Sequence, residues 1–184
     1  MKATGIVRRI DDLGRVVIPK EIRRTMRIRE GDPLEIYTDR EGEVIFKKYS
    51  PIGELASFAS QYAETLQKIC SMAVIITDRD AVIASAGVSK KEYGERKVSY
   101  DMEKIMEKRS LYVHRDGGEK VTVIDDSTSH FVSCAMPIVS EGDIIGSVCS
   151  VIANGEAGER KLSEEVETKL IQTAANFLSR QMES

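Results

Sequence analysis

The first 50 residues of this 184-residue chain are too few to bury a substantial core, and the first 31 of them are strongly basic. Residues 1–31 carry nine Lys and Arg against four Asp and Glu, a net charge of +5, whereas the whole chain has a net charge of −3. A basic end on an acidic body indicates a polyanionic partner for that end alone. We therefore expect the N-terminal segment to bind nucleic acid.

The residue pattern of this segment predicts short strands around one short helix. Residues 4–10 and 16–18 are rich in β-formers, and residues 11–14 form a turn in which Gly14 can adopt a positive φ. Pro19 suits the first position of a helix, where its missing N–H costs nothing. Residues 31–33 end that helix, and two more strands are expected at 34–38 and 44–49.

A unit of this size buries too small a fraction of its surface to be stable alone. Residues 1–50 contain no cysteine and no cluster of metal ligands that could staple it. Oligomerisation is the remaining remedy, so we expect strands from two chains to share one core and to leave few free edges.

Four stretches of the segment, residues 4–8, 12–19, 21–24 and 34–37, resemble the AbrB-type swapped-hairpin DNA-binding domain of bacterial transition-state regulators. The longest is Asp-Leu-Gly-Arg-Val-Val-Ile-Pro. The resemblance implies that two chains exchange hairpins to build one β-barrel that prefers AT-rich, degenerate DNA sites. It also implies that four arginines contact the DNA and that Arg9 and Lys20 contribute less. The four are Arg8, Arg15, Arg23 and Arg24.

Arginine suits this role because its planar fork matches phosphates and guanine edges. Four arginines doubled in a dimer could neutralise about 8 phosphates, which corresponds to a salt slope of roughly −7. The alternative interpretation is a solvated face with incidental salt bridges to the four acids. No helix-turn-helix, zinc-finger or basic-zipper pattern is visible, which argues against recognition by one long helix in the major groove. The preference for AT-rich, degenerate sites that the resemblance implies fits recognition of groove shape more than a strict base code.

Residues 51–71 form the predicted connection between the two parts of the chain. Apolar residues at 52, 55, 59, 62, 66 and 69 follow the 3-4 spacing of a helix with one apolar stripe. Two interpretations remain open and are compatible. The helix packs on the adjacent domain, or it also pairs with its counterpart in a dimer.

Residues 72–184 predict an antiparallel sheet flanked by helices. Strands are expected at 73–78, 81–86, 111–114, 121–125, 130–140 and 144–153, and helices at 89–94, 100–109 and 160–181. The element order, with residues 135–139 and 142–148 as a central hairpin, resembles a GAF domain. The resemblance implies a small-molecule pocket between the sheet and the helices at 89–109. Ser99, Tyr100 and the loop 125–129 are polar candidates for its lining, but no residue selects a ligand. The alternative is a pocket filled by its own side chains, in a domain that serves only to dimerise.

The remaining polar residues predict neither catalysis nor a metal or other cofactor. Cys70, Cys134 and Cys149 lie in apolar surroundings typical of reduced core thiols. Neither they nor His114 and His130 show the spacing of a zinc site, and no hydrolase or nucleotide-binding motif is present. No apolar run approaches the length of a membrane span, so we expect a cytoplasmic, nucleoid-associated bacterial protein without a membrane partner.

The sequence thus predicts an α+β protein of two domains, a swapped-hairpin barrel at 1–50 and a GAF-like domain at 72–184, joined by the helix at 51–71. The predicted function is a DNA-binding transcription regulator. It would dimerise through residues 1–50 and form a tetramer through the C-terminal helices, with an unidentified small molecule as a further partner. The alternative is an antitoxin built on the same barrel, although such proteins usually end in a short flexible tail.

Overall fold

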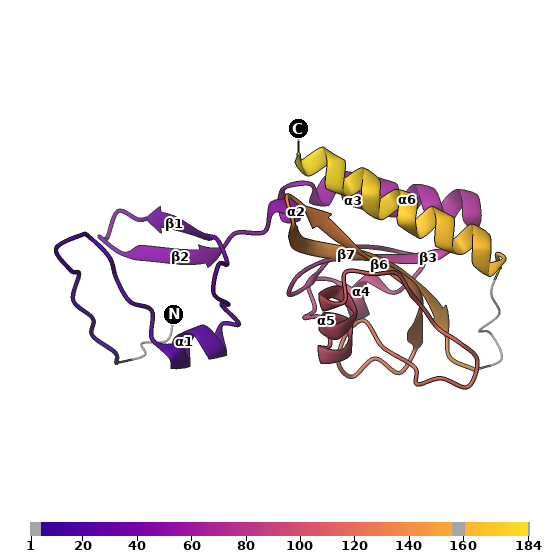
Figure 1. Cartoon of the computed structure of the whole chain (residues 1–184), viewed down its shortest axis with the longest axis horizontal. Helices are drawn as coiled ribbons and strands as arrows, with labels where there is room; N and C mark the ends of the chain where they lie inside the picture. The colour runs from indigo at the N-terminus through magenta and orange to yellow at the C-terminus, as the bar shows by residue number, and fades with distance from the viewer. Residues whose placement is uncertain (1–4, 156–160, 184) are drawn as a thin grey trace. The chain divides into compact units, whose positions relative to one another are not determined.

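The structure is a computed structural model that describes residues 5–155 and 161–183. The chain divides into two compact units, Met1–Tyr49 and Ser50–Ser184, called here the N-terminal and the C-terminal unit. Figure 1 shows both units coloured along the chain. Each unit is described by itself.

The N-terminal unit contains one helix and one hairpin. Strands β1 (Leu34–Thr38) and β2 (Val44–Lys48) pair in antiparallel register from Leu34↔Lys48 to Thr38↔Val44. The turn between them includes Gly42, whose φ of 86° favours glycine. The two strands predicted at 34–38 and 44–49 are therefore confirmed, the second ending one residue earlier.

Helix α1 (Lys20–Thr25) begins directly after Pro19, which is the N-cap and so lies one residue before the first helical position predicted for it. It ends where Arg27 takes a left-handed φ of 53°. The amide of Ile28 then donates to the carbonyl of Arg23 at 2.7 Å, a Schellman-type closure that satisfies one of the last helical carbonyls. An arginine at this αL position carries a strain that glycine would not.

The strands predicted at 4–10 and 16–18 are not formed over residues 5–19 of the single chain, and residue 4 lies outside the described residues. The turn between them is formed, because the amide of Gly14 donates to the carbonyl of Asp11 at 3.0 Å. The prediction was wrong for one isolated chain. A β-strand forms only where its backbone amides and carbonyls pair with another strand. Among the described residues of this unit, the segments 5–10 and 16–19 pair with no strand.

The C-terminal unit is built on one five-stranded antiparallel sheet of order β4-β3-β7-β6-β5. Its centre is the long hairpin β6–β7, with β3 beside β7 and β4 and β5 at the edges. The strand bounds are β3 (Ala73–Asp78), β4 (Val82–Ala86), β5 (Tyr112–Val113), β6 (His130–Ser140) and β7 (Asp143–Ala153).

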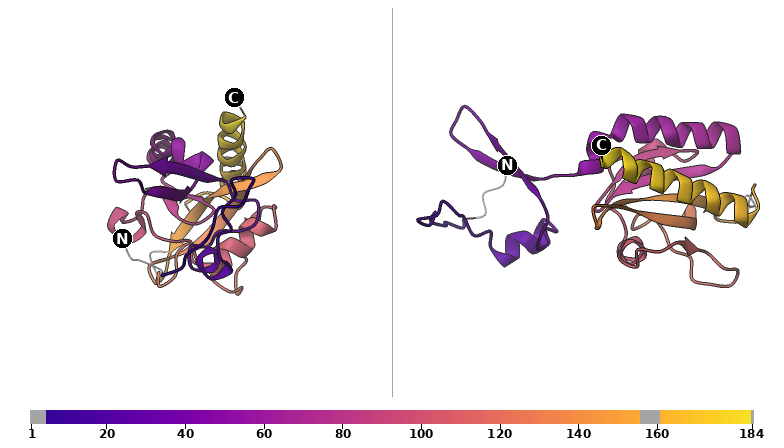
Figure 2. Two further views of the ribbon diagram at one scale, coloured as in Figure 1. Left: turned by 90° about the vertical axis from the view of Figure 1, so that its left-hand side faces the viewer. Right: turned by 45° about the horizontal axis from the view of Figure 1, so that its top comes forward.

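Helices cover both faces of this sheet, as Figures 1 and 2 show. Helices α2 (Pro51–Glu54), α3 (Ala56–Cys70) and α6 (Glu164–Met182) enclose one core, in which Ile52, Ile171 and Leu178 are fully buried. Helices α4 (Lys90–Tyr93) and α5 (Tyr100–Glu107) enclose the second, around Tyr93 and Met102. The two faces of β6 and β7 therefore contribute to different cores.

The helices differ from the prediction in two ways. The expected helix from residue 52 is interrupted at Leu55, which caps both α2 and α3. Its buried face also differs from the predicted apolar stripe. Ile69, the last residue of that stripe, is 78% exposed, whereas Ala63, which lies outside the stripe, is buried. Helix α3 packs against β3 and β4, so the helix-on-domain interpretation holds within this unit.

One predicted strand of the C-terminal unit is missing. Residues 121–125 form only an isolated bridge, between Ile124 and Val98. Their backbone groups are used elsewhere, since the Val121 carbonyl accepts from Val132 and the Val123 carbonyl accepts from Ser99. The predicted hairpin of 111–114 with 121–125 was therefore wrong, and β5 pairs with β6 instead.

Candidate nucleic-acid interface

Arg15 closes a tight turn whose geometry depends on Asp11. The Oδ1 atom of Asp11 accepts the backbone amides of Leu13 at 3.0 Å and of Arg15 at 2.7 Å. The Oδ2 atom accepts the side-chain Nε of Arg15 at 2.7 Å. One carboxylate thus shapes the turn and holds the side chain at its end.

These bonds also set the acidity of Asp11. The Arg15 amide first, and then the Arg15 guanidinium, hold the pKa of the Asp11 carboxyl below its ordinary value. The carboxylate is consequently ionised throughout the neutral range, and its charge offsets part of the positive charge that Arg15 presents.

Arg23 and Arg24 lie on α1 and come from neighbouring positions of one short helix. Arg24 is exposed and Arg23 is half-buried. Lys20, at the start of the same helix, is exposed. Arg8 and Arg9 are exposed in the segment that forms no strand. The structure therefore brings Arg23 and Arg24 together on α1, whereas Arg8 lies in a segment that forms no strand and Arg15 lies at the end of the Asp11 turn.

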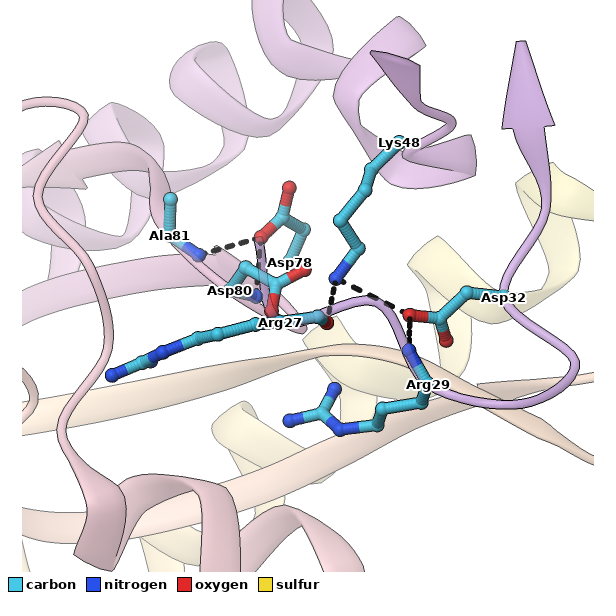
Figure 3. A network of polar contacts seen from close by, with 7 residues as sticks. All are labelled: Arg27, Arg29, Asp32, Lys48, Asp78, Asp80 and Ala81. Atoms are coloured by element: carbon cyan, nitrogen blue, oxygen red, sulfur yellow. Dashed lines mark hydrogen bonds and ion pairs between the residues drawn. The ribbon is translucent and has the colours of Figure 1, made fainter. Parts of the chain in front are cut away.

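A network that the sequence analysis missed ties the end of α1 to β2. The Lys48 ammonium lies 3.3 Å from Oδ2 of Asp32 and donates to the Arg27 carbonyl at 2.9 Å. The same Asp32 oxygen accepts the Arg29 amide at 2.8 Å, and the Asp32 side chain is only 3% exposed (Figure 3). This network fixes the segment that follows the two arginines of α1.

Figure 3 also shows the turn between β3 and β4 in the C-terminal unit. Oδ1 of Asp78 accepts the amides of Asp80 and Ala81, each at 2.7 Å. This carboxylate stabilises the tight turn, so it has a local structural role.

The N-terminal unit leaves many large apolar side chains in solvent. Val7 is 88% exposed, although a residue of its type normally lies inside a protein. The other exposed large apolar residues of this unit are Ile6, Ile10, Leu13, Val16, Val17, Met26, Ile36, Tyr37, Val44, Phe46 and Tyr49. One chain alone therefore leaves the apolar surface of this unit largely uncovered.

The expected pocket residues of the C-terminal unit have structural partners. The Ser99 hydroxyl caps α5 by accepting the Met102 amide at 3.1 Å, and it donates to the Thr122 carbonyl at 2.6 Å. Tyr100 is 66% exposed and carries the Lys104 ammonium 4.3 Å from its ring centroid.

Within the loop 125–129, two serines join a polar cluster. The hydroxyls of Ser127 and Ser129 both donate to Oε1 of Glu92, at 3.1 and 2.6 Å. Because their protons are used in this way, they accept from Tyr93 Oη and from His130 Nδ1, each at 2.8 Å. The cluster connects the loop to α4 and to the start of β6.

A cavity of about 200 Å³ lies at one end of the sheet, and its lining includes His130, the partner of Ser129, but neither of the two serines. The lining also includes Gln67, Lys161 and Glu167. Glu167 is itself buried, and its carboxylate accepts the hydroxyls of Ser133 at 3.1 Å and Ser150 at 2.5 Å. The stripe predicted for α6 placed no charge in the core, so this carboxylate was missed.

Three further features concern other kinds of site. Cys134 and Cys149 are buried free thiols, and burial raises the pKa of the Cys149 thiol. Over residues 5–155 and 161–183, three or more potential ligands do not come together to hold a metal ion. Within the same residues, each helix is too short or too polar to cross a bilayer.

Two family models match the chain. The one described as "Stage V sporulation protein T C-terminal, transcription factor" covers residues 54–183. The one described as "Antidote-toxin recognition MazE, bacterial antitoxin" covers residues 7–53. The larger match is to a family of transcription factors, which are not enzymes.

The chain is 52% identical over 185 residues to stage V sporulation protein T of Bacillus subtilis, covering 100% of this chain and 99% of that protein. It is 65% identical over 51 residues to the transition state regulatory protein AbrB of the same organism, covering 28% of this chain and 52% of that protein. This match confirms the resemblance seen in the N-terminal segment.

Among solved structures, the GAF domain of a phosphoenolpyruvate-protein phosphotransferase from Coxiella burnetii matches with a TM-score of 0.52 at 13% identity. It covers 70% of this chain and 82% of that one. At this identity the likeness concerns the fold alone, and it confirms the predicted α+β class with a GAF-like C-terminal part. With identity and coverage of this extent to its sporulation relative, the chain belongs to the stage V sporulation protein T family.

Proposed function

We propose that this protein is a DNA-binding transcription regulator of bacterial sporulation whose DNA-contacting residues are Arg8, Arg15, Arg23 and Arg24. The observation that carries the proposal is the basic surface of the N-terminal unit, where Arg15 ends a turn and Arg24 extends from a short helix, both exposed. The relative AbrB, 65% identical in this segment, is a transition state regulatory protein.

The N-terminal domain at residues 1–50 acts as a dimer. Two features support this: the exposed apolar residues around Val7, and the segments on either side of the Asp11–Arg15 turn, which form no strand in the described part of one chain. A second copy would cover the apolar residues and would pair with these segments as strands. A dimer also doubles the arginines, which strengthens binding to phosphates.

The domain at residues 72–184, with the helix at 51–71, serves sensing, tetramer assembly or both. Supporting features are the five-stranded antiparallel sheet and a group of partly exposed aromatic side chains that α3 and α6 share. Phe58 and Tyr62 lie with their ring centroids 5.6 and 5.7 Å from that of Phe177. The protein then works on AT-rich promoters in the cytoplasm, associated with the nucleoid, and has no catalytic role.

The test is DNA binding by the full-length protein as a function of salt, with an AT-rich promoter duplex. Arg24→Ala is expected to weaken binding at least tenfold and to make the salt slope shallower by about 2 per dimer. Arg40→Ala is the matched control, because Arg40 is an exposed arginine of the same unit in the β1–β2 turn. Equal losses for both variants would contradict a specific role of Arg24, and salt-independent binding by the wild type would contradict the whole proposal.

An antitoxin is the second candidate, because the N-terminal segment matches a family described as antitoxins. The folded C-terminal unit of Ser50–Ser184 argues against it, since an antitoxin tail usually masks its toxin as a flexible segment. A small protein that co-purifies stoichiometrically and inhibits growth when expressed alone would favour this candidate.

A further inference from the structure

Two turns of the N-terminal unit share one construction. Residues 11–15 and 39–43 both begin with Asp and have Gly at the fourth position with positive φ, 76° at Gly14 and 86° at Gly42. In the second turn, Oδ1 of Asp39 accepts the amides of Glu41 at 3.0 Å and Glu43 at 2.8 Å. These bonds correspond to those of Asp11 with Leu13 and Arg15.

The turns differ at their fifth residue, which is Arg15 in the first and Glu43 in the second. Of these two residues only Arg15 carries a donor for the remaining oxygen of the capping carboxylate, and Oδ2 of Asp11 accepts Nε of Arg15 at 2.7 Å. The turn itself requires only Oδ1, since the second turn forms with a glutamate at the corresponding place. The Asp11–Arg15 side-chain bond is therefore an addition to a turn that is complete without it.

The bond restricts how Arg15 presents its guanidinium. With Nε bound to Asp11, the two terminal Nη groups are the edge left to contact a ligand, and the side chain is still 69% exposed. A fork held in this way can form a paired contact with a base edge or a phosphate in one orientation. A free arginine would instead follow whichever phosphate is nearest.

We propose that Asp11 is a positioning residue that makes Arg15 discriminate between DNA sequences at the expense of general DNA affinity. The proposal rests on the proposed DNA-binding function. The Asp11 carboxylate repels phosphates and competes with them for the guanidinium, which lowers binding to any duplex. By fixing the fork, it confines strong contact to duplexes whose groove shape or base edges fit that one orientation.

The experiment compares dissociation constants for an AT-rich promoter duplex and a GC-rich duplex of equal length, with full-length protein at several salt concentrations. Asp11→Asn is the main variant, because the asparagine side-chain carbonyl still accepts the two turn amides while the charge on Oδ2 is lost. Asp39→Asn is the matched control, because Asp39 has the same place in the turn 39–43. Arg15→Ala and the double variant test whether Asp11 acts through Arg15.

Asp11→Asn is expected to tighten binding to the GC-rich duplex about threefold and to lower the ratio of the two affinities about tenfold, the scale of one paired arginine contact. Asp39→Asn leaves the ratio unchanged. In the Arg15→Ala background, Asp11→Asn has no further effect on the ratio, because the two changes remove one contact. Arg15→Lys, which keeps the charge but lacks both Nε and the fork, also lowers the ratio and serves if Asp11→Asn fails to fold.

An equal loss of discrimination in Asp11→Asn and Asp39→Asn would overturn the proposal, because both would then act through turn stability. So would an effect of Asp11→Asn that persists without Arg15, or a wild-type protein that binds both duplexes equally. Failure of the underlying function is distinct, since the wild type would then bind neither duplex in a salt-dependent manner.

Discussion

Glu167 on α6 accepts the Ser150 hydroxyl of β7 at 2.5 Å and thereby joins the terminal helix to the centre of the sheet. Its other oxygen accepts Ser133 of β6 at 3.1 Å. Both serines are buried, and the carboxylate is the nearer acceptor for the Ser150 hydroxyl, which also lies 3.4 Å from the Cys134 carbonyl oxygen.

Glu167→Ala should therefore lower the free energy of unfolding by about 3 kcal/mol, because two buried hydroxyls lose their bonds to a carboxylate and the side chain leaves the core. Glu165→Ala is the matched control on the same turn of α6, where Glu165 pairs with Lys169 in solvent. Its effect should stay within about 0.5 kcal/mol. Urea unfolding of the full-length protein measures both, and equal effects would contradict the structural role of Glu167.

Lys48→Met should destabilise the N-terminal unit by about 2 kcal/mol. The change removes the ammonium that lies 3.3 Å from the nearly buried Asp32 carboxylate, and a buried carboxylate that loses a cationic neighbour is costly. Lys47→Met is the control, since Lys47 is the exposed neighbour on the same strand. Hydrogen exchange of the amides of 28–36 should accelerate in Lys48→Met alone, and unchanged exchange would show that the pair contributes little.

Residues 1–50 expressed alone should be dimeric or unfolded and never a stable folded monomer. The exposed side chains around Val7 and Ile10 give a single copy too small a core. Sedimentation combined with circular dichroism over a range of concentrations tests this. A folded species with the mass of one chain would refute the shared core.

The Asp11 carboxyl should titrate below the ordinary aspartate pKa of about 3.9. Because its folded pKa is lowered, its contribution to stability is present above that ordinary value and is lost as the pH falls through the folded pKa. Arg15→Ala should raise the pKa only part of the way, since the Arg15 amide, the larger cause, remains. Carboxyl NMR titration measures both values, and a full return to the ordinary pKa would contradict the dominance of the amide.

The sequence was most informative where structure depends on neighbouring residues. Pro19 precedes α1 as its N-cap, and the Ser163 side chain caps α6 by accepting the Val166 amide at 3.4 Å. Seven predicted strands, at 34–38, 44–49, 73–78, 81–86, 111–114, 130–140 and 144–153, were located to within one residue at each end. The role of the four arginines in DNA contact stays a prediction.

The sequence did not predict other features, because the residues that cause them lie far apart in the chain. Residues 121–125 form no strand because the amides of Ser99 and Val132, which are distant in the chain, bond to two of their carbonyl oxygens. The strands predicted on either side of the Asp11 turn depended on a partner that one chain does not supply. Nothing near Glu167 in the sequence indicated that the hydroxyls of two serines, 17 and 34 residues earlier, would donate to its carboxylate in the core.

By itself, the sequence determined the basic N-terminal segment, the turn at residues 11–14 and the order of the helices and of the hairpins β1–β2 and β6–β7, because charge, turn chemistry and periodicity act over a few residues. Only the tertiary structure decided that Asp32 lies beside Lys48, that Glu167 enters the core and that Asp11 holds the side chain of Arg15. These relations depend on where side chains meet once the chain has packed. Packing selects among the many partners that a local pattern permits.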